Sequence, residues 1–373
     1  MIAMIRRYYA PMNNARTYFA ASYAEARAGF LAAARRRGIA VETALNPLKG
    51  AQGEDLATDT VLLGKAGGAS LLVVTSGTHG VEGFCGSGCQ RALLDDDDLQ
   101  RRIDAAHVAV LAIHAVNPYG FSHLRRVNED NVDMNRNFRD FADAKELNPA
   151  YAGVHDLLLP VEWPPTEGNR NDILACVEKM GMPAFQAAVS AGQRSHKDGL
   201  FYCGNAPTWS NRTIRALLKK HGGARKRIGW IDLHTGLGPY GHGEKIFAGA
   251  NDAAELARAR AWWGADIMSY YEGKSASIEV QGSMVMAIYG ECPQAEATGL
   301  GLEFGTIPFD AVLAALRGDH WLAIHPDAPA AKRNEIKRAI LGAFYIDADD
   351  WKGMILGQSR SAILQAVMSL SEH

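Results

Sequence analysis

Two parts of the sequence contain side chains that could hold a metal ion and activate water. The first is Gly77-Thr-His79-Gly-Val-Glu82-Gly83, in which two residues separate a histidine from a glutamate. Residues three apart on a turn can point the same way, and imidazole and carboxylate are both good ligands of Zn²⁺. The spacing therefore predicts two ligands of one ion, although a His-x-x-Glu pair is often only structural.

The second part is Asp232-Leu-His234-Thr-Gly236, which follows an apolar run. A strand over 228–233 would deliver His234 to the edge of a sheet. Asp232 lies two residues earlier and shares a strand face with it. Asp232 could orient a metal-binding His234, or it could cap a buried turn.

An acidic residue interrupts a later apolar run, Gly299-Leu-Gly-Leu-Glu303-Phe304. A buried carboxylate is costly unless it is paired or has a chemical role. Glu303 is therefore a candidate for proton transfer, with a structural ion pair as the alternative.

Arginines are concentrated in the segment from Arg125 to Arg136, which also contains Asp133 and Asn135. Guanidinium groups make forked contacts with carboxylates and stabilise oxyanions. Near a metal they would indicate an anionic substrate or transition state. Taken alone, the segment is also compatible with a solvated loop.

Four short apolar runs bring these clusters together, at 70–75, 107–113, 227–233 and 299–304. Such runs are typical of buried strands, and they alternate with expected helices at 14–37, 172–180, 330–341 and 359–370. The pattern predicts an α/β fold with a mostly parallel mixed sheet and helices on both faces. Ligands of such sheets bind beyond the carboxyl ends of the strands, where the clusters would converge.

Composition argues against several classes of protein, namely nucleic-acid-binding, membrane-spanning and disulfide-stabilised proteins. The formal net charge of −2 gives no electrostatic argument for binding nucleic acid or an anionic membrane. No apolar stretch is long enough for a membrane span, and five thinly spread cysteines argue against a disulfide framework. We expect a cytoplasmic protein, with a single domain over 1–373 that has its core at about 70–306 and helical additions at both ends. The sequence does not indicate an oligomeric state.

The ordered set of motifs resembles the zinc metallocarboxypeptidase family, which is carboxypeptidase A-like. The order is His-x-x-Glu, Asn-Pro-x-Gly, Arg, Asp-x-Asn-Arg-Asn, a strand-borne His and a late strand-borne Glu. The segments His234–Glu244 and Leu302–Thr306 are similar to a bacterial branch catalogued as a domain of unknown function. The resemblance covers about 70–306 and implies a metallocarboxypeptidase-like fold.

The resemblance implies a role for each matching residue. It implies one Zn²⁺ ion held by His79, Glu82 and His234, with Glu303 as the general base. Arg126 matches the arginine that polarises the scissile carbonyl, and Arg125 is its close rival. Asn135 and Arg136 match the pair that binds a terminal carboxylate of the substrate.

Further candidates lie close to these motifs. The family usually has a mobile tyrosine before the catalytic glutamate, for which Tyr289 and Tyr240 are the candidates. His242, in the glycine-rich loop after His234, is a candidate for substrate binding.

Chemistry and resemblance together predict a zinc-dependent hydrolase that cleaves an amide or peptide bond near a substrate carboxylate. Three protein ligands leave one position of a tetrahedral zinc ion for water. The expected substrate is a small peptide, as for a carboxypeptidase. The alternative substrate is an N-acyl amino acid, as for aspartoacylase and succinylglutamate desuccinylase. A further alternative is a catalytically inactive binding protein on the same fold.

Overall fold

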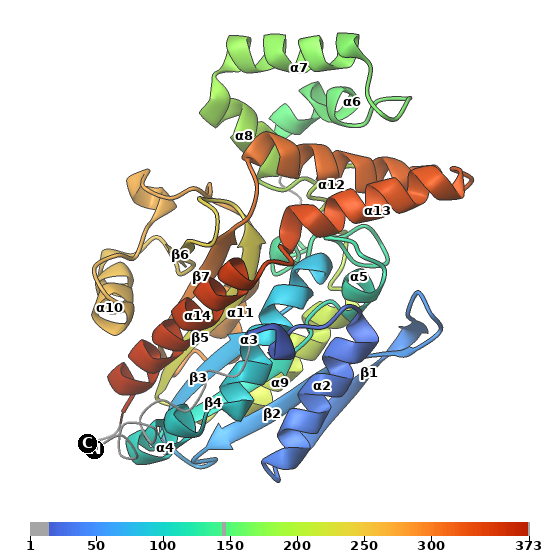
Figure 1. The fold of residues 1–373 in the computed structure, drawn as a ribbon. Helices are drawn as coiled ribbons and strands as arrows, with labels where there is room; N and C mark the ends of the chain where they lie inside the picture. Colours follow the sequence, from blue (N-terminus) through green and yellow to red (C-terminus); the bar gives the residue numbers. More distant parts are fainter. Residues whose placement is uncertain (1–14, 144–146, 372–373) are drawn as a thin grey trace, which may run out of the picture.

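A seven-stranded mixed sheet forms the centre of the protein (Figure 1). The computed structural model describes residues 15–143 and 147–371. The strand order is β1-β2-β4-β3-β5-β7-β6. The strands are β1 (Val41–Lys49), β2 (Asp55–Gly64), β3 (Ser70–Thr75), β4 (Ala109–His114), β5 (Arg227–Gly236), β6 (Gly243–Phe247) and β7 (Glu296–Gly305). The four central strands are parallel, whereas β2 and β6 run antiparallel to their neighbours. The predicted α/β class with a mixed sheet is confirmed.

Side chains alternate between two apolar layers along the central strands. In β3, Leu72 and Val74 belong to one buried cluster, and Leu71 and Val73 belong to the other. This alternation follows the two-residue period of a strand. Burial on both faces also explains why the predicted strands are continuous apolar runs.

Helices cover both faces of the sheet. The first face packs against α2 (Tyr23–Arg36), α3 (Gly83–Asp95), α4 (Asp97–Ala106), α10 (Ala253–Trp263) and α14 (Asp349–Ser369). The second face packs against α9 (Trp209–Gly222) and α11 (Ala287–Glu291). A short helix, α5 (Pro118–Ser122), follows β4.

A separate group of helices lies beyond the carboxyl ends of the central strands, at the top of Figure 1. It consists of α6 (His155–Leu158), α7 (Glu167–Met180), α8 (Met182–Ser190), α12 (Phe309–Ile324) and α13 (Ala330–Phe344). These helices share their own apolar cluster, which includes Phe185, Val312 and Ile340. We call this group the helical cap.

The structure corrects the expected bounds of two elements and the expected character of the N-terminal addition. The run predicted at 107–113 becomes a strand only at Ala109, because His107 has a left-handed backbone (φ 56°) that ends α4. The N-terminal addition was expected to be helical, but β1 and β2 extend the sheet itself. The expected helix at 14–37 divides into a 3-10 turn at Ala15–Tyr18 and α2, and residue 14 lies outside the described residues.

The structure also describes the state of the cysteines and the character of the helices. All five cysteines are free thiols. Among the described residues, no helix combines the length and apolarity required to cross a membrane.

Candidate metal centre and active-site cavity

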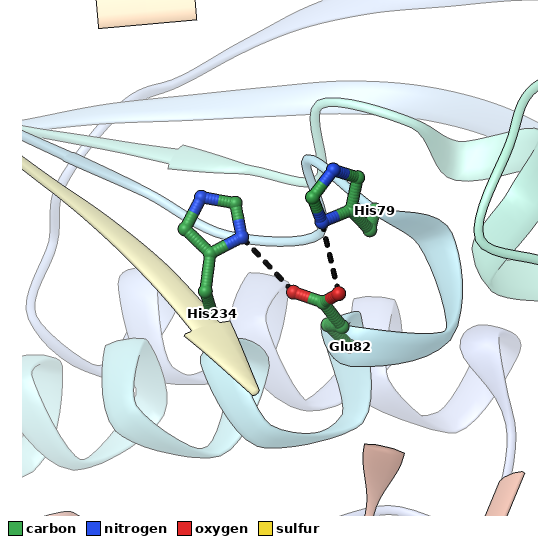
Figure 2. Close-up of side chains that lie close together, drawn as sticks. All are labelled: His79, Glu82 and His234. Atoms are coloured by element: carbon green, nitrogen blue, oxygen red, sulfur yellow. Dashed lines mark hydrogen bonds and ion pairs between the residues drawn. The ribbon is translucent and has the colours of Figure 1, made fainter. Parts of the chain in front are cut away.

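Three side chains converge at the carboxyl ends of β3 and β5 (Figure 2). His79 Nδ1 lies 2.9 Å from Glu82 Oε1, and His234 Nδ1 lies 3.0 Å from Glu82 Oε2. Figure 2 shows both imidazoles directed at the one carboxylate. The sequence motifs that contain these residues lie about 150 positions apart, so the fold brings them together.

The donor set suits a divalent cation. Among the described residues, these three form the one group of His, Cys, Asp or Glu side chains whose ligand atoms all lie within 4.8 Å of one another. A tetrahedral ion with bonds of about 2.0–2.1 Å holds its ligand atoms roughly 3.3 Å apart. The gaps of 2.9 and 3.0 Å are close to that spacing. The residues therefore fit a three-ligand metal centre.

The turn that contains His79 and Glu82 is hydrogen-bonded to the segment around Gly120 and Arg126 and packs closely against it. Gly80 N donates to Arg126 O at 3.0 Å, and Val81 N donates to Arg125 O at 2.9 Å. A Cβ atom on Gly80 would lie 2.0 Å from the Gly120 carbonyl carbon. Glycine is therefore required at position 80, where two backbones approach each other closely.

An aspartate fixes the ring of His79. Nε2 of His79 lies 3.1 Å from Asp133 Oδ1 and 2.8 Å from Arg126 Nη2; in the tautomer that donates from Nε2 to Asp133, Nδ1 is left free for an ion. Asp133 is fully buried and also accepts from the backbone N–H of Asn135 at 2.9 Å. Burial opposes its charge, but the electrostatic interactions with Arg126 and then with His79 outweigh that effect and hold the pKa of Asp133 well below its usual range.

A second aspartate fixes His234 in the same way. Nε2 of His234 donates to Asp232 Oδ2 at 2.6 Å. The other oxygen of Asp232 accepts from the hydroxyls of Thr75 and Thr78 at 2.6 and 2.7 Å. Of the two roles open to Asp232 from sequence, the contacts support orientation of the imidazole. Although burial opposes the charge of His234, Asp232 and Glu82 raise its pKa well above the usual value.

Strand register places Glu303 beside His234. β5 and β7 are parallel, and their register pairs His234 with Glu303. Glu303 lines the same cavity as His79 and His234, and its Oε1 accepts from Leu237 N at 2.8 Å. Burial, followed by the negative charge of Glu82, raises the pKa of Glu303 to about 7.

Arg126 lies between the metal centre and its supporting aspartate. Its guanidinium donates to Glu82 Oε1 at 3.1 Å and to Asp133 Oδ2 at 3.0 Å. Burial opposes its charge, but these two carboxylates outweigh that effect and raise the pKa of Arg126. The side chain also lines the cavity, so a permanent positive charge faces the space next to the three ligands.

Asn135 and Arg136 line the cavity on the side of the segment 282–285. Asn135 Oδ1 accepts from Met284 N at 2.9 Å, which leaves its amide nitrogen as a donor. The guanidinium of Arg136 donates to Ser190 O at 2.6 Å and to Asn135 O at 3.0 Å. Those contacts hold a second arginine in the wall of the cavity, and Arg136 is only 4% exposed.

Comparison with known protein families identifies one family whose model matches most of the chain. The model of a family described as "Protein of unknown function (DUF2817)" matches residues 19–358. The chain belongs to the DUF2817 family. No curated protein matches its sequence.

Solved structures similar to this DUF2817 member share its fold at low sequence identity. Bovine thrombin-activatable fibrinolysis inhibitor, solved with tick carboxypeptidase inhibitor, is 12% identical with a TM-score of 0.51, and the match covers 95% of this chain and 98% of that one. Carboxypeptidase A from Helicoverpa armigera is 14% identical with a TM-score of 0.42 and coverages of 86% and 73%. A metallo-carboxypeptidase from Burkholderia cenocepacia is 11% identical with a TM-score of 0.41 and coverages of 95% and 71%.

The match to the bovine structure, at a TM-score of 0.51, confirms the expected resemblance at the level of the fold: this DUF2817 member shares the α/β fold of that protein. Because the identities are low, the likeness establishes the fold alone.

Three of the predicted substrate-binding residues lie outside the cavity. Arg125 donates to Asp319 Oδ2 at 3.0 Å and to Asn131 Oδ1 at 3.1 Å, so its charge serves a buried ion pair. The Tyr289 hydroxyl donates to Glu255, and His242 is exposed. Tyr240, the other tyrosine considered, is 44% exposed and donates to Asp350. None of these four residues lines the cavity.

The sequence reasoning also missed residues that the fold places at the site. Asp133 was part of a recognised motif but had no assigned role, although its spacing of two residues before Asn135 was visible. Tyr270 lines the cavity from a 3-10 turn, Tyr270–Glu272, in the segment between α10 and α11. Residues of α8, α12 and α13 also line it, and no polar motif marked them.

Proposed function

We propose that this protein is a zinc-dependent amide hydrolase that acts on a small substrate with a carboxylate next to the scissile bond. The observation that carries the proposal is the contact of His79 Nδ1 and His234 Nδ1 with the two oxygens of Glu82, at 2.9 and 3.0 Å, in a cavity shared with Glu303. His79, Glu82 and His234 would hold the ion.

A zinc ion in a three-ligand site supplies Lewis acidity, and it lowers the pKa of water to about 7. The protein orients its ligands for this purpose through Asp133 and Asp232. Each aspartate lies within hydrogen-bond distance of Nε2 of one histidine and would accept its proton, which would keep the opposite nitrogen, Nδ1, available for the ion.

Glu303 would act as the general base. Its carboxylate lies on the strand next to His234, and the N–H of Leu237 holds one of its oxygens. The other oxygen would accept a proton from the attacking water. The same carboxyl would later pass that proton to the leaving nitrogen, so that Glu303 finishes the reaction in its starting state.

The two arginines would have different tasks. Arg126 borders the metal ligands and would stabilise the negative charge that develops on the carbonyl oxygen. Arg136 and Asn135 would bind the substrate carboxylate, because together they offer a guanidinium and an amide donor in the cavity wall. Fixing that end of the substrate would orient the scissile bond.

Replacing the proposed base tests this function. We expect Glu303→Gln to retain zinc but to lower kcat at least about a hundredfold, because the amide cannot accept a proton. The assay uses zinc-loaded protein with N-acyl amino acids and short peptides, and zinc content is measured for each variant. Glu296→Gln is the matched control, since Glu296 begins the same strand and its side chain pairs with Arg258 outside the cavity.

Two results would count against the proposal. Near-normal turnover by Glu303→Gln would reject the assigned base. A wild-type protein that holds zinc but releases no amine from any of these compounds would reject the hydrolase and favour a binding protein.

A further inference from the structure

We propose that the helical cap provides an apolar acyl-binding wall and restricts the substrate to small N-acyl amino acids with an apolar acyl chain. The wall consists of Phe309, Val312, Leu313, Leu316 and Phe344. This inference rests on the proposed amide hydrolase and names its substrate class and the residues that select it.

The acyl wall lines the cavity without any charge. Its residues come from α12 and the end of α13, and the cavity-lining residues of α8 and α12 include no charged side chain. Four of the five wall residues belong to the buried apolar cluster of the cap, and Phe309 packs against it. The cap also lines the cavity with two polar side chains of α8, Gln186 and Ser190, but the five wall residues offer no polar side chain. Against the wall itself, a polar or charged acyl group would lose its hydration without gaining a partner, whereas an alkyl or aryl group would be stabilised.

The positions of the polar groups in the cavity indicate how a substrate would be oriented. Asn135 and Arg136 lie beside the segment that continues into Val285, whereas Phe344 lies on the side of Glu303. A Cβ built on Gly236 would be 3.0 Å from the Phe344 ring and 3.6 Å from Glu303 Oε1. With its carboxylate held by Arg136, the substrate would extend past Glu303 toward the acyl wall, because Phe344 lies beside Glu303.

The amino-acid part of the substrate would face an apolar floor. Ile246, Phe247 and Val285 line the cavity on the sheet side, and each is at most 8% exposed. An amino acid with an apolar side chain, such as leucine, matches this surface.

The helix α12 limits the space available to a long acyl group on one side of the cavity. Water has access to about 130 Å³ of it, which is room for on the order of ten water molecules. Val312, Leu313 and Leu316 are only 3%, 8% and 4% exposed although they line the cavity, so α12 covers this side of it. A polypeptide that extends from the scissile bond toward the acyl wall would meet this helix.

A substrate series tests the size and polarity of the acyl group. The compounds are N-acetyl-, N-butanoyl- and N-hexanoyl-leucine, with a tripeptide and a decapeptide that end in leucine. We expect kcat/KM to rise at least about tenfold from acetyl to hexanoyl, since each buried methylene contributes roughly 0.8 kcal/mol. The decapeptide should be hydrolysed at least about a hundredfold less efficiently than N-hexanoyl-leucine.

Filling the acyl wall should remove the preference for the longer chain. We expect Leu316→Trp to lower kcat/KM for N-hexanoyl-leucine at least about tenfold while N-acetyl-leucine changes little. Ala314→Trp is the matched control, because Ala314 is on the exposed side of the same helix. Leu313→Ala, which enlarges the site without adding bulk, should move the optimum toward a longer chain. A thermal melt of each variant verifies folding.

Calorimetric titration separates the binding site from the reaction. Full-length protein treated with a chelator is titrated with N-acetyl- and N-hexanoyl-leucine. We expect the hexanoyl compound to bind more tightly to wild type and to Ala314→Trp, and at least about tenfold more weakly to Leu316→Trp.

Each outcome has a distinct meaning. Equal binding of the two compounds would overturn the acyl wall, whether or not hydrolysis occurs. Hydrolysis of the decapeptide as efficient as that of N-hexanoyl-leucine would overturn the size limit and leave the proposed hydrolase intact. Chain-length-dependent binding without any hydrolysis would support the acyl wall and contradict the proposed function.

Discussion

The metal centre and the acyl wall border the same cavity but are built on different principles. In the metal centre, each imidazole contacts Glu82 through Nδ1 and an aspartate through Nε2. In the acyl wall, packing alone positions the side chains. Hydrogen-bonded groups tolerate little change in geometry, whereas apolar surfaces tolerate changes of shape. We infer that the first region determines the chemistry and that the second determines which substrate reaches it.

The neighbouring arginines offer the largest expected effect. Arg126→Ala should lower kcat by about 10²–10³-fold, because it removes the donor next to the reacting carbonyl. Steady-state kinetics with zinc-loaded protein measures this change. Arg125→Ala is the matched control: it breaks the ion pair with Asp319 outside the cavity, so it should reduce thermal stability and leave kcat per folded molecule nearly unchanged. An equal loss of kcat in the two variants would contradict the assignment of a catalytic role to Arg126 and a purely structural role to Arg125.

The ion pair of Asp319 should give the next largest effect, in stability. Burial opposes the charge of Asp319, but the charges of Arg125 and Lys337 outweigh it and lower the pKa of Asp319 to about 2. The unfolded value is about 3.9, so the stabilisation is present above about pH 4 and is lost as the pH falls toward 2. Asp319→Asn should therefore lower the free energy of unfolding by roughly 2–3 kcal/mol near pH 7.

Denaturant unfolding of wild type and Asp319→Asn at several pH values measures this dependence. The difference between the two proteins should be constant from about pH 8 to pH 5 and should shrink below about pH 4. A difference that grows on acidification would show that Asp319 is not held as a buried anion.

The aspartates behind the histidines should give a smaller effect, on metal affinity. Asp133→Asn and Asp232→Asn should each weaken zinc binding about 10–100-fold, because each histidine loses the acceptor that orients it. Competition with a chromogenic chelator measures the affinity. Asp319→Asn is the control, since Asp319 is equally buried but pairs with Arg125 and Lys337 and with neither histidine. Unchanged affinity in both site variants would contradict the orienting role.

The two regions also differ in how well sequence predicts them. His79, Glu82, His234 and Glu303 stand at the ends of continuous apolar runs, and the rule that ligands bind beyond the carboxyl ends of parallel strands brings them together. The supporting contact of Asp232 with His234 was also open to prediction, because residues two apart share a strand face.

Other features depend on long-range packing and left no local pattern. Arg125 and Arg126 are adjacent and chemically identical, and only tertiary contacts with Asp319 or with Glu82 and Asp133 separate their roles. Tyr270 and Leu316 reach the cavity from a loop and from a helix of the cap. Periodicity predicts that a helix buries such side chains, but not which surface they face.

Zinc binding tests the central claim most directly. Purified full-length protein is loaded with zinc, dialysed and analysed for metal, beside Glu82→Ala and the control Glu296→Ala. The account predicts one tightly bound ion per chain in wild type and control, and loss of that ion from Glu82→Ala. A wild-type chain that retains no zinc, or a Glu82→Ala variant that binds it with unchanged affinity, would contradict the account.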